Sequence, residues 1–359
     1  MIYDWTPAAV LPNLYGNEGV EGDVIGIVPS EDERVVAFGK AHSNLAEFLS
    51  RFTDAFGVPL KPLVLIVRND IIQNINDISA IASFRDLASM CAVPYGRAMA
   101  SLYPNGGHRL SYANSFWLYP WMLGKDQQYL YSITPAMQGC HVVDQFHGQS
   151  SPDLTEKDLH DVDKPLFEAL FPVWRRYYLG KRRVWKDSAL FRSLNMAANA
   201  AQMPGGMDTT LYDLGRSASL WVSAFEILAH PRTAKSDLKN VYGLMESVAY
   251  LDRRMERKSY IAHFPSMKKK PWPRRPLSCW LYGELYKARN DFLHGNQVSA
   301  RRLTRGLDTS LFWCAPGLYR MALTGFLGLK IDKSDPSWYS RQYQSTIERA
   351  LLKVRKQPD

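Results

Sequence analysis

A histidine follows an arginine by five positions in the segment RNDFLHG, residues 289–295. The imidazole of His294 can accept or donate a proton near neutral pH, and the guanidinium of Arg289 offers a fixed fork of donors to anionic oxygens. The polar side chains of Asn290 and Asp291 come directly after the arginine. Together these residue types are suited to moving a proton at a negatively charged group.

A helix is predicted to carry this segment. Apolar side chains recur along it at steps of three and four residues, at Leu277, Leu281, Leu285, Ala288 and Phe292. The spacing predicts an amphipathic helix over residues 278–294, which Gly295 ends. Positions five apart on an ideal helix differ by about 140° in azimuth. Arg289 and His294 can therefore meet within one chain only if the last turn unwinds before Gly295.

The rest of the second half of the chain is also predicted to be helical. Amphipathic periods cover residues 163–180, 186–202, 209–229, 237–262 and 299–323, and a final helix is expected near 340–355. Thr210 and Asp213 are placed as a capping pair for the third of these helices, and Ser236 can cap the fourth. Because apolar stripes so close in the sequence need one another for burial, we expect a helical bundle.

Residues 289–295 resemble the signature of the HEPN superfamily, in which four to six residues separate an arginine from a histidine. The match is closest to the Apea-like branch, whose last core helix typically runs through an RN-containing stretch to a terminal HG. The segment WVSAFEIL, residues 221–228, is similar to the first core helix of that branch. The resemblance covers residues 208–325, approximately, and does not extend to the first 150 residues.

The resemblance implies a metal-independent endoribonuclease that needs no cofactor. A 2′-hydroxyl attacks the adjacent phosphorus, and a cyclic phosphate is left on the RNA. By this resemblance His294 acts as general acid or base and Arg289 stabilises the phosphorane, while Asn290 and Asp291 can orient the imidazole or the RNA backbone. HEPN relatives commonly form homodimers whose two motifs line one cleft, and they often serve bacterial defence or stress responses, some of them as toxins. Asn296 stands where some toxin relatives carry a tyrosine that a partner enzyme nucleotidylates, so the sequence does not support that form of regulation.

Other uses of these residues remain open. Many HEPN domains are non-catalytic and use the same helices for scaffolding or RNA binding, in which case Arg289 would cap carbonyls or hold the bundle together. Arg257 and His263 also satisfy the loose spacing, but this arginine lacks the following Asn and this histidine lacks the following Gly. Glu226, in an otherwise apolar stretch, is predicted to pair with Arg289 or with another buried cation.

A cationic segment closely precedes the helix of Arg289. Its basic residues are Arg253, Arg254, Arg257, Lys258, Lys268, Lys269, Lys270, Arg274 and Arg275. Several prolines predict a loop over residues 264–276. The cations can neutralise phosphates and Trp272 can stack an unpaired base, while Arg301 and Arg302 extend the positive field beyond the histidine. We expect RNA contact here, although a solvated, solubilising surface is the commoner role of a run of charges.

Charge is unevenly distributed along the 359 residues, whose net charge is +9. Residues 1–150 carry 9 Lys and Arg against 14 Asp and Glu, a net charge of −5, whereas residues 151–359 carry 35 against 21, a net charge of +14. Such asymmetry predicts that the second part meets a polyanion, and nucleic acid is the first candidate. The domain boundary is expected near residue 150, where the composition turns polar.

The first 150 residues are predicted to form a mixed α/β domain that senses a protein or small-molecule trigger, recruits a partner or restrains the second part. Strands are expected at residues 23–28, 35–38 and 63–67, and residues 109–120 and 128–134 are expected to form a hairpin. A helical period relates Leu45, Phe48, Phe52 and Phe56. The predicted fold class is α+β, a mixed α/β domain (1–150) followed by an all-α domain (151–359) with a HEPN-like core.

Several other kinds of protein are not indicated. The chain has no run of about 18 apolar residues and no secretion signal, which predicts a cytoplasmic protein without a membrane partner. His141, Asp144 and His147 fit no metal-binding spacing, so no metal site is predicted, and Walker, GxGxxG and GxSxG motifs are absent from the sequence. Reduced and mostly buried thiols are expected at the dispersed Cys91, Cys140, Cys279 and Cys314.

Overall fold

The computed structural model describes residues 4–50, 52–53, 56–72, 78–105, 111–120, 122–123, 130–131, 159, 161–203, 209–233, 237–263, 273–296, 299–304, 310–330 and 338–354. The chain divides into two compact units. Unit 1 comprises residues 1–88, 114–162 and 178–181, and unit 2 comprises residues 89–113, 163–177 and 182–359. This division is more interleaved than a single boundary near residue 150. Among the described residues, no helix has both the length and the apolar character needed to cross a bilayer.

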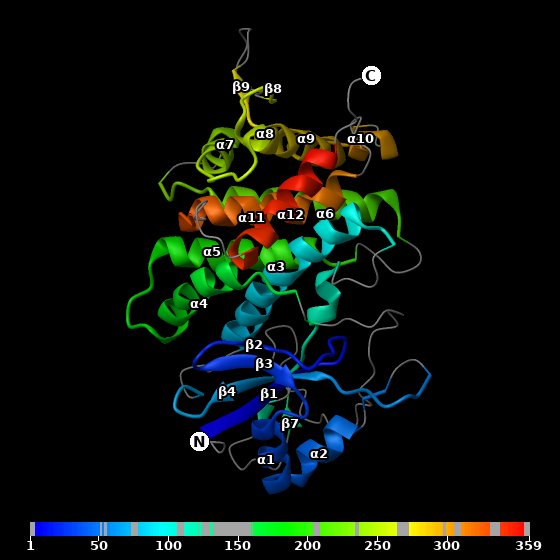
Figure 1. Ribbon diagram of the computed structural model, residues 1–359, viewed down its shortest axis with the longest axis vertical. Helices are drawn as coiled ribbons and strands as arrows, with labels where there is room; N and C mark the ends of the chain where they lie inside the picture. The colour runs from blue at the N-terminus through cyan, green and yellow to red at the C-terminus, as the bar shows by residue number, and fades with distance from the viewer. Residues whose placement is uncertain are drawn as a thin grey trace. The chain divides into compact units, whose positions relative to one another are not determined.

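Unit 1 is built on a five-stranded antiparallel sheet with the strand order β2-β3-β4-β1-β5 (Figure 1). Its strands are β1 (Trp5–Leu11), β2 (Val20–Glu21), β3 (Ile25–Pro29), β4 (Leu63–Arg68) and β5 (Tyr119–Pro120). The two strands expected at residues 23–28 and 63–67 are therefore present, as β3 and β4. Both are apolar and buried along almost their whole length, which explains why their β-branched runs predicted them well.

The aromatic segments of unit 1 pair differently from the expected hairpin. Strand β5, from the first segment, pairs with β1, whereas β7 (Leu130–Tyr131), from the second, pairs with β6 (Met122–Leu123). A 3-10 turn, η2 (Ala113–Phe116), precedes β5. The predicted pairing of residues 109–120 with 128–134 is thus wrong for the residues that the structure describes.

Residues 35–38 form part of helix α1 (Glu33–Ala41) rather than a strand. Asp32 caps this helix, since its carboxylate accepts the backbone N–H of Arg34 at 2.9 Å. A side-chain cap satisfies donors that the first turn leaves unpaired, and here it outweighs the β-branched pair Val35-Val36. The helix buries Val35 against β3 and β4.

Helix α2 (Ser43–Ser50) follows directly and covers the sheet with α1. Leu45 and Phe48 lie on α2 as their spacing predicted, and they pack with Phe52, which follows the helix, against Val10 of β1. Phe56, expected on the same stripe, is 82% exposed because the helix has already ended.

Helix α3 (Ile78–Leu102), which the sequence did not indicate, is the longest described helix.

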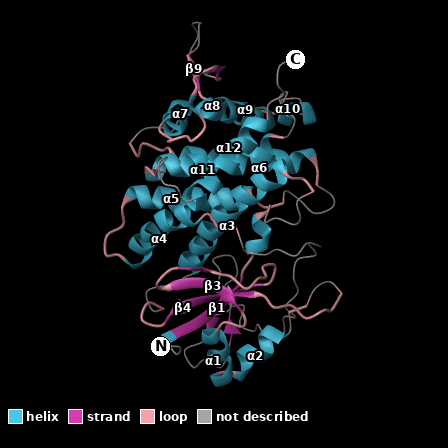
Figure 2. Ribbon diagram, viewed as in Figure 1, coloured by secondary structure: helices cyan, strands magenta, loops and turns pink. Residues whose placement is uncertain are grey.

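Unit 2 is predominantly helical (Figure 2). Its remaining helices are α4 (Lys164–Leu179), α5 (Trp185–Ala200), α6 (Leu211–Leu228), α7 (Leu238–Glu246), α8 (Arg253–Glu256), α9 (Leu277–Leu293), α10 (Ala300–Thr304), α11 (Leu311–Leu327) and α12 (Trp338–Lys353). An aromatic core joins α6, α9 and α11, because the ring of Phe225 lies 4.9 Å from that of Tyr282 and 5.4 Å from that of Tyr319. The observed composition of helices and an antiparallel sheet is α+β.

The predicted helix boundaries of unit 2 are confirmed for helices that bury one apolar stripe along their whole length. Helices α4, α5, α6 and α9 begin and end within two residues of the expected bounds, and the capping box of Thr210 and Asp213 is present. The helix expected over residues 237–262 is wrong. It stops after α7, whose cap is Asp237, and short helix α8 and strand β8 (Tyr260–Ile261) follow. The helix expected over residues 299–323 is likewise divided, because Ser310 starts α11 with a new cap.

A buried polar network fixes the first of these breaks. The carboxylate of Glu348 on α12 accepts the backbone N–H groups of Leu251 and Asp252 at 2.9 and 2.7 Å. These donors consequently need no helical partner, and Asp252 is left to cap α8. Gln344, one turn earlier, connects Glu348 to the buried Arg320 of α11, whose guanidinium lies 2.8 Å from Asp163.

Candidate functional site

Helices α6 and α9 approach each other closely where the HEPN-like segment begins. A Cβ on Gly215 would lie 2.0 Å from the ring of Phe292, so only glycine allows this contact. The same two helices also share the Phe225 and Tyr282 contact further along. The packing fixes the rotation of α9, and with it the direction of the side chains on its last two turns.

Arg289 points from α9 toward α6. Its guanidinium donates a hydrogen bond to Glu226 at 2.8 Å and lies 4.9 Å from the ring centre of Tyr286. The pair is partly covered, with 19% of the Arg289 side chain and 27% of the Glu226 side chain exposed. The predicted pairing of Glu226 with Arg289 is confirmed.

Burial and the neighbouring cation act in opposite directions on the pKa of Glu226. Burial raises the pKa of the Glu226 carboxyl, and the neighbouring Arg289 opposes this rise without cancelling it. Tyr282 lies fully buried nearby, where burial raises the pKa of its phenol strongly.

His294 caps the carboxyl end of α9 and is exposed to solvent. Its backbone N–H donates to the carbonyl of Asn290 at 3.0 Å, and that of Asn296 donates to Asp291 at 3.2 Å. Gly295 between them has φ +69°, a left-handed conformation that glycine adopts without strain. The helix thus ends in a Schellman-type motif, and Gly295 stops it as expected.

The last turn of α9 does not unwind before His294. Because the bond from His294 N–H to Asn290 is still helical, the backbone keeps Arg289 and His294 about 140° apart in azimuth. The unwinding expected for convergence within one chain is wrong. Asp291 accepts a weak hydrogen bond from the Asn296 side chain at 3.4 Å, which ties it to the helix end.

The described part of the cationic segment leads from α8 through a two-stranded ladder. Tyr260 and Ile261 of β8 pair with Arg275 and Arg274 of β9 (Arg274–Arg275), so residues 274–275 are a strand rather than the expected loop. Lys268, Lys269, Lys270 and Trp272 lie outside the described residues, as does the side chain of Arg302.

The cations of this segment differ in how far their charge is neutralised. Arg275 is bound to Glu246 at 2.6 Å and stacks on Tyr242, and Arg254 is bound to Asp252 at 2.7 Å. Among the described residues, Arg274 donates to the backbone carbonyl of Ser259 and has no ion-pair partner. Exposed cations without an ion-pair partner among the described residues are Arg253, Arg257, Lys258 and Arg301. These four, with Arg274, are the described basic residues available to an incoming phosphate.

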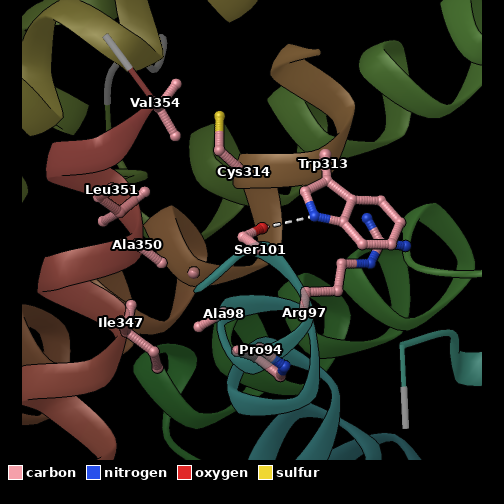
Figure 3. Close-up of a pocket in the computed structure, with 11 residues that line it drawn as sticks. Pro94, Arg97, Ala98, Ser101, Trp313, Cys314, Ile347, Ala350, Leu351 and Val354 are labelled. Carbon is pink, nitrogen blue, oxygen red and sulfur yellow. Dashed lines mark hydrogen bonds between the residues drawn. The ribbon is translucent and has the colours of Figure 1, made fainter. Parts of the chain in front are cut away.

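A small hollow elsewhere in unit 2 is not suited to a substrate. It lies between α3, α11 and α12 and is lined mainly by apolar side chains, with Trp313 donating to Ser101 at 2.6 Å (Figure 3). Its volume of about 20 Å³ is about the room that one water molecule needs. Arg97 on its wall is buried, donates to three backbone carbonyls, and has its pKa lowered to about 10 by burial.

A second cationic surface was missed by the sequence analysis. Residues 171–203 contain seven Lys and Arg and one acidic residue, Asp187. The same stretch contains an aromatic and basic run at residues 174–178, but its Trp174 is fully buried. The exposed residues lie just beyond it, at the start of α5. A charge count over windows of about thirty residues would have found them.

Comparison with protein-family models, with curated proteins and with solved structures finds no match for this chain.

Cys91, Cys279 and Cys314 are buried free thiols, as expected, and Cys140 lies outside the described residues. Within the described residues, no three or more His, Cys, Asp or Glu side chains are grouped to hold a metal ion. The trio at residues 141–147 falls outside them.

Proposed function

We propose that the chain is a cytoplasmic, metal-independent endoribonuclease of the HEPN type that acts as a homodimer. The observation that carries the proposal is the α6–α9 pair, in which Arg289 of the HEPN-like motif is held by Glu226 and His294 ends α9 at a left-handed glycine. Both helices belong to the stretch that resembles the Apea-like branch. Unit 1 would then sense a trigger or restrain the nuclease, in keeping with a role in bacterial defence or stress.

The cleavage needs one base, one acid and a cation at the phosphate. One imidazole takes the proton of a 2′-hydroxyl while its oxygen attacks the adjacent phosphorus. The bond from phosphorus to the 5′-oxygen breaks, and a second imidazole protonates that leaving oxygen. The products are a 2′,3′-cyclic phosphate and a 5′-hydroxyl, and no water is consumed. Arg289 stabilises the negative oxygens of the phosphorane.

A homodimer would bring together the arginine and histidine side chains that a single chain keeps apart. The regular end of α9 separates Arg289 from His294 by about 140°, and one chain supplies a single motif histidine. Two copies that meet at the ends of their α9 helices would bring His294 from each to one cleft, together with both Arg289 side chains. The pair then provides the base and the acid at once.

A second function is favoured by one specific observation. Arg289 is 19% exposed and already bound to Glu226, so its guanidinium also fits a structural role between α6 and α9. The chain would then be a non-catalytic HEPN protein that binds RNA through its exposed cations. This alternative predicts RNA binding without cleavage.

Cleavage of RNA in the presence of EDTA separates the two functions. The purified chain is incubated with a labelled RNA, and products are analysed for 2′,3′-cyclic phosphate ends. Cleavage that survives chelation and is lost in His294→Ala and Arg289→Ala supports the nuclease. Binding without cleavage by the wild-type chain supports the scaffold.

Matched variants protect this experiment from misinterpretation. Two control variants should cleave RNA as the wild type does. His42→Ala removes a histidine from unit 1, and Arg216→Ala removes an exposed arginine from α6. Because Arg289→Ala strands Glu226, the double variant Arg289→Gln with Glu226→Gln tests the lost cation without a stranded charge. Mixing His294→Ala chains with wild-type chains should lower the activity below that of the wild-type fraction alone, because a mixed dimer holds only one of the two imidazoles.

The exposed cations of the segment before α9 have their own test. Arg253→Gln, Arg257→Gln and Lys258→Gln together should lower the slope of log affinity against log salt for single-stranded RNA by about 2, because each lost phosphate contact is worth about 0.7. The triple variant of Lys268, Lys269 and Lys270 to alanine tests the part outside the described residues. An unchanged affinity and slope in both variants would remove this segment from the RNA site.

A further inference from the structure

The start of α5 gathers exposed cations around an exposed tryptophan. We call this group the α5 surface, and it consists of Arg182, Arg183, Trp185, Lys186 and Arg192. Trp185 is 37% exposed although it is among the largest apolar side chains of the protein. Trp185 and Arg192 are seven residues apart, so they lie on one face of α5, about 10 Å from each other along the helix.

No carboxylate among the described residues forms an ion pair with the cations of the α5 surface. The one acidic residue of residues 171–203, Asp187, is buried and bound to Arg176 at 2.7 Å. Arg183 is held over the ring of Tyr177 at 5.2 Å and Lys186 over that of Phe326 at 4.7 Å. Aromatic faces position a cation and leave its charge intact, whereas a carboxylate would cancel it. Arg182 and Arg192 have no ion-pair partner among the described residues.

Trp185 is positioned beside these cations by a contact with the turn that follows α6. The ring of His230 packs edge-on against Trp185, with the ring centres 5.8 Å apart. The backbone N–H of Arg232 donates to His230 Nδ1 at 3.0 Å, and Arg232 has a left-handed φ of 70°. The turn after α6 therefore supports one side of Trp185 and leaves part of it open to solvent.

We propose that the α5 surface binds single-stranded RNA, with its cations against phosphates and Trp185 stacked on an unpaired base. The inference rests on the proposed function for the identity of the polyanion. It adds a second contact region that neither the HEPN-like motif nor the segment before α9 includes. The start of α5 and the carboxyl end of α9 lie at different ends of unit 2 (Figure 1). An RNA that touches both regions must therefore extend along the unit.

An anionic lipid surface could also attract these cations and accept a tryptophan at its headgroups. RNA is the better partner because the rest of α5 buries its apolar side in the bundle, so no apolar helix face is left for lipid. Val184 and Trp185 are the exposed large apolar side chains at this turn. Their small area matches one stacked base better than an inserted helix.

The test measures binding by the full chain in the His294→Ala background, so that cleavage does not interfere. A fluorescent 20-nucleotide oligouridylate is titrated at several salt concentrations. Arg182→Gln with Arg192→Gln removes two charges that support no described contact, and should lower the salt slope by about 1.4 at about 0.7 per contact. Trp185→Ala should weaken binding about 5- to 100-fold with little change in slope, because stacking is not electrostatic.

Controls separate this inference from its alternatives. Lys40→Gln with Lys239→Gln removes two exposed charges elsewhere and should leave the slope unchanged. Equal slopes and affinities for the α5 variants and this control would overturn the inference, even if RNA cleavage depends on His294. Loss of binding to phosphatidylserine vesicles by the α5 variants, with RNA binding intact, would also overturn it in favour of a lipid partner. If the wild type never cleaves RNA but the α5 variants lose RNA affinity, the inference stands and the nuclease proposal fails.

Discussion

Neutralising Asp163 should be one of the most damaging single changes to unit 2. Asp163 and Arg320 are 2% and 1% exposed, and the guanidinium lies 2.8 Å from the carboxylate. Asp163→Asn keeps the size of the side chain and an oxygen that can cap Leu166 at the start of α4. It leaves the charge of Arg320 buried with the neutral Gln344 as its other described acceptor. Removing one partner of such a pair typically costs about 3–5 kcal/mol.

This cost is a large fraction of the total stability of about 5–15 kcal/mol that is usual for a folded protein. Urea unfolding followed by tryptophan fluorescence measures it, since Trp174 and Trp221 are fully buried in unit 2. Asp187→Asn is the matched control and should cost about 1 kcal/mol or less, because its partner Arg176 is 52% exposed and can regain water. A cost for Asp163→Asn that equals that of the control would refute the reasoning.

Three further predictions concern the helix contact, the ion pair and the thiols. Gly215→Ala should destabilise the chain by about 1–3 kcal/mol through overpacking against Phe292, and adding Phe292→Ala should recover part of this loss in the same urea assay. Because burial raises the folded pKa of Glu226, its stabilising contribution is present at acidic pH and is lost as pH rises through that pKa. Unfolding between pH 4 and 7 should therefore show Glu226→Gln gaining stability over the wild type as pH rises, and the opposite drift would contradict the shift. Burial raises the pKa of Cys279 and of Cys314 to about 12, so in a chain whose other cysteines are serine, iodoacetamide at pH 8 should label these thiols only as fast as unfolding exposes them.

The sequence predicted those helices of unit 2 whose buried side is a regular stripe. Helix α6 is the clearest case, since its stripe through Ala218, Trp221 and Phe225 is buried and its capping box is local. Helix α3 gave no such signal because most of its residues from 87 to 98 are buried whichever way they point. A helix covered on all sides has no apolar period to detect. Pro94 stands in its middle, where proline is unfavourable, yet the helix continues through it.

The breaks in the predicted helices could not be read from local patterns. The stripe of residues 237–262 continues through Val248 and Met255, which are both buried. The helix stops because Glu348, almost one hundred positions later, accepts the N–H groups of Leu251 and Asp252. Long-range acceptors of this kind compete with helical bonds and leave no mark on nearby sequence.

The ion pair of the candidate site could be predicted from the sequence, but the relative orientation of the Arg289 and His294 side chains could not. The unusual carboxylate in an apolar stretch led to Glu226, and its bond to Arg289 is present. Whether His294 shares the face of Arg289 depended on one backbone hydrogen bond at the helix end. The α5 surface depended on which of several aromatic residues is covered, since Trp174 is buried and Trp185 is exposed. Burial of that kind is decided by tertiary packing.

The bond between Glu348 and the turn at residues 251–252 has a consequence for biosynthesis. The ribosome makes this carboxylate almost one hundred residues after the turn that it completes. Until α12 has emerged and docked, α8 and the cations that follow it lack their anchor. A nascent chain therefore cannot complete this part of its surface before α12 has been synthesised.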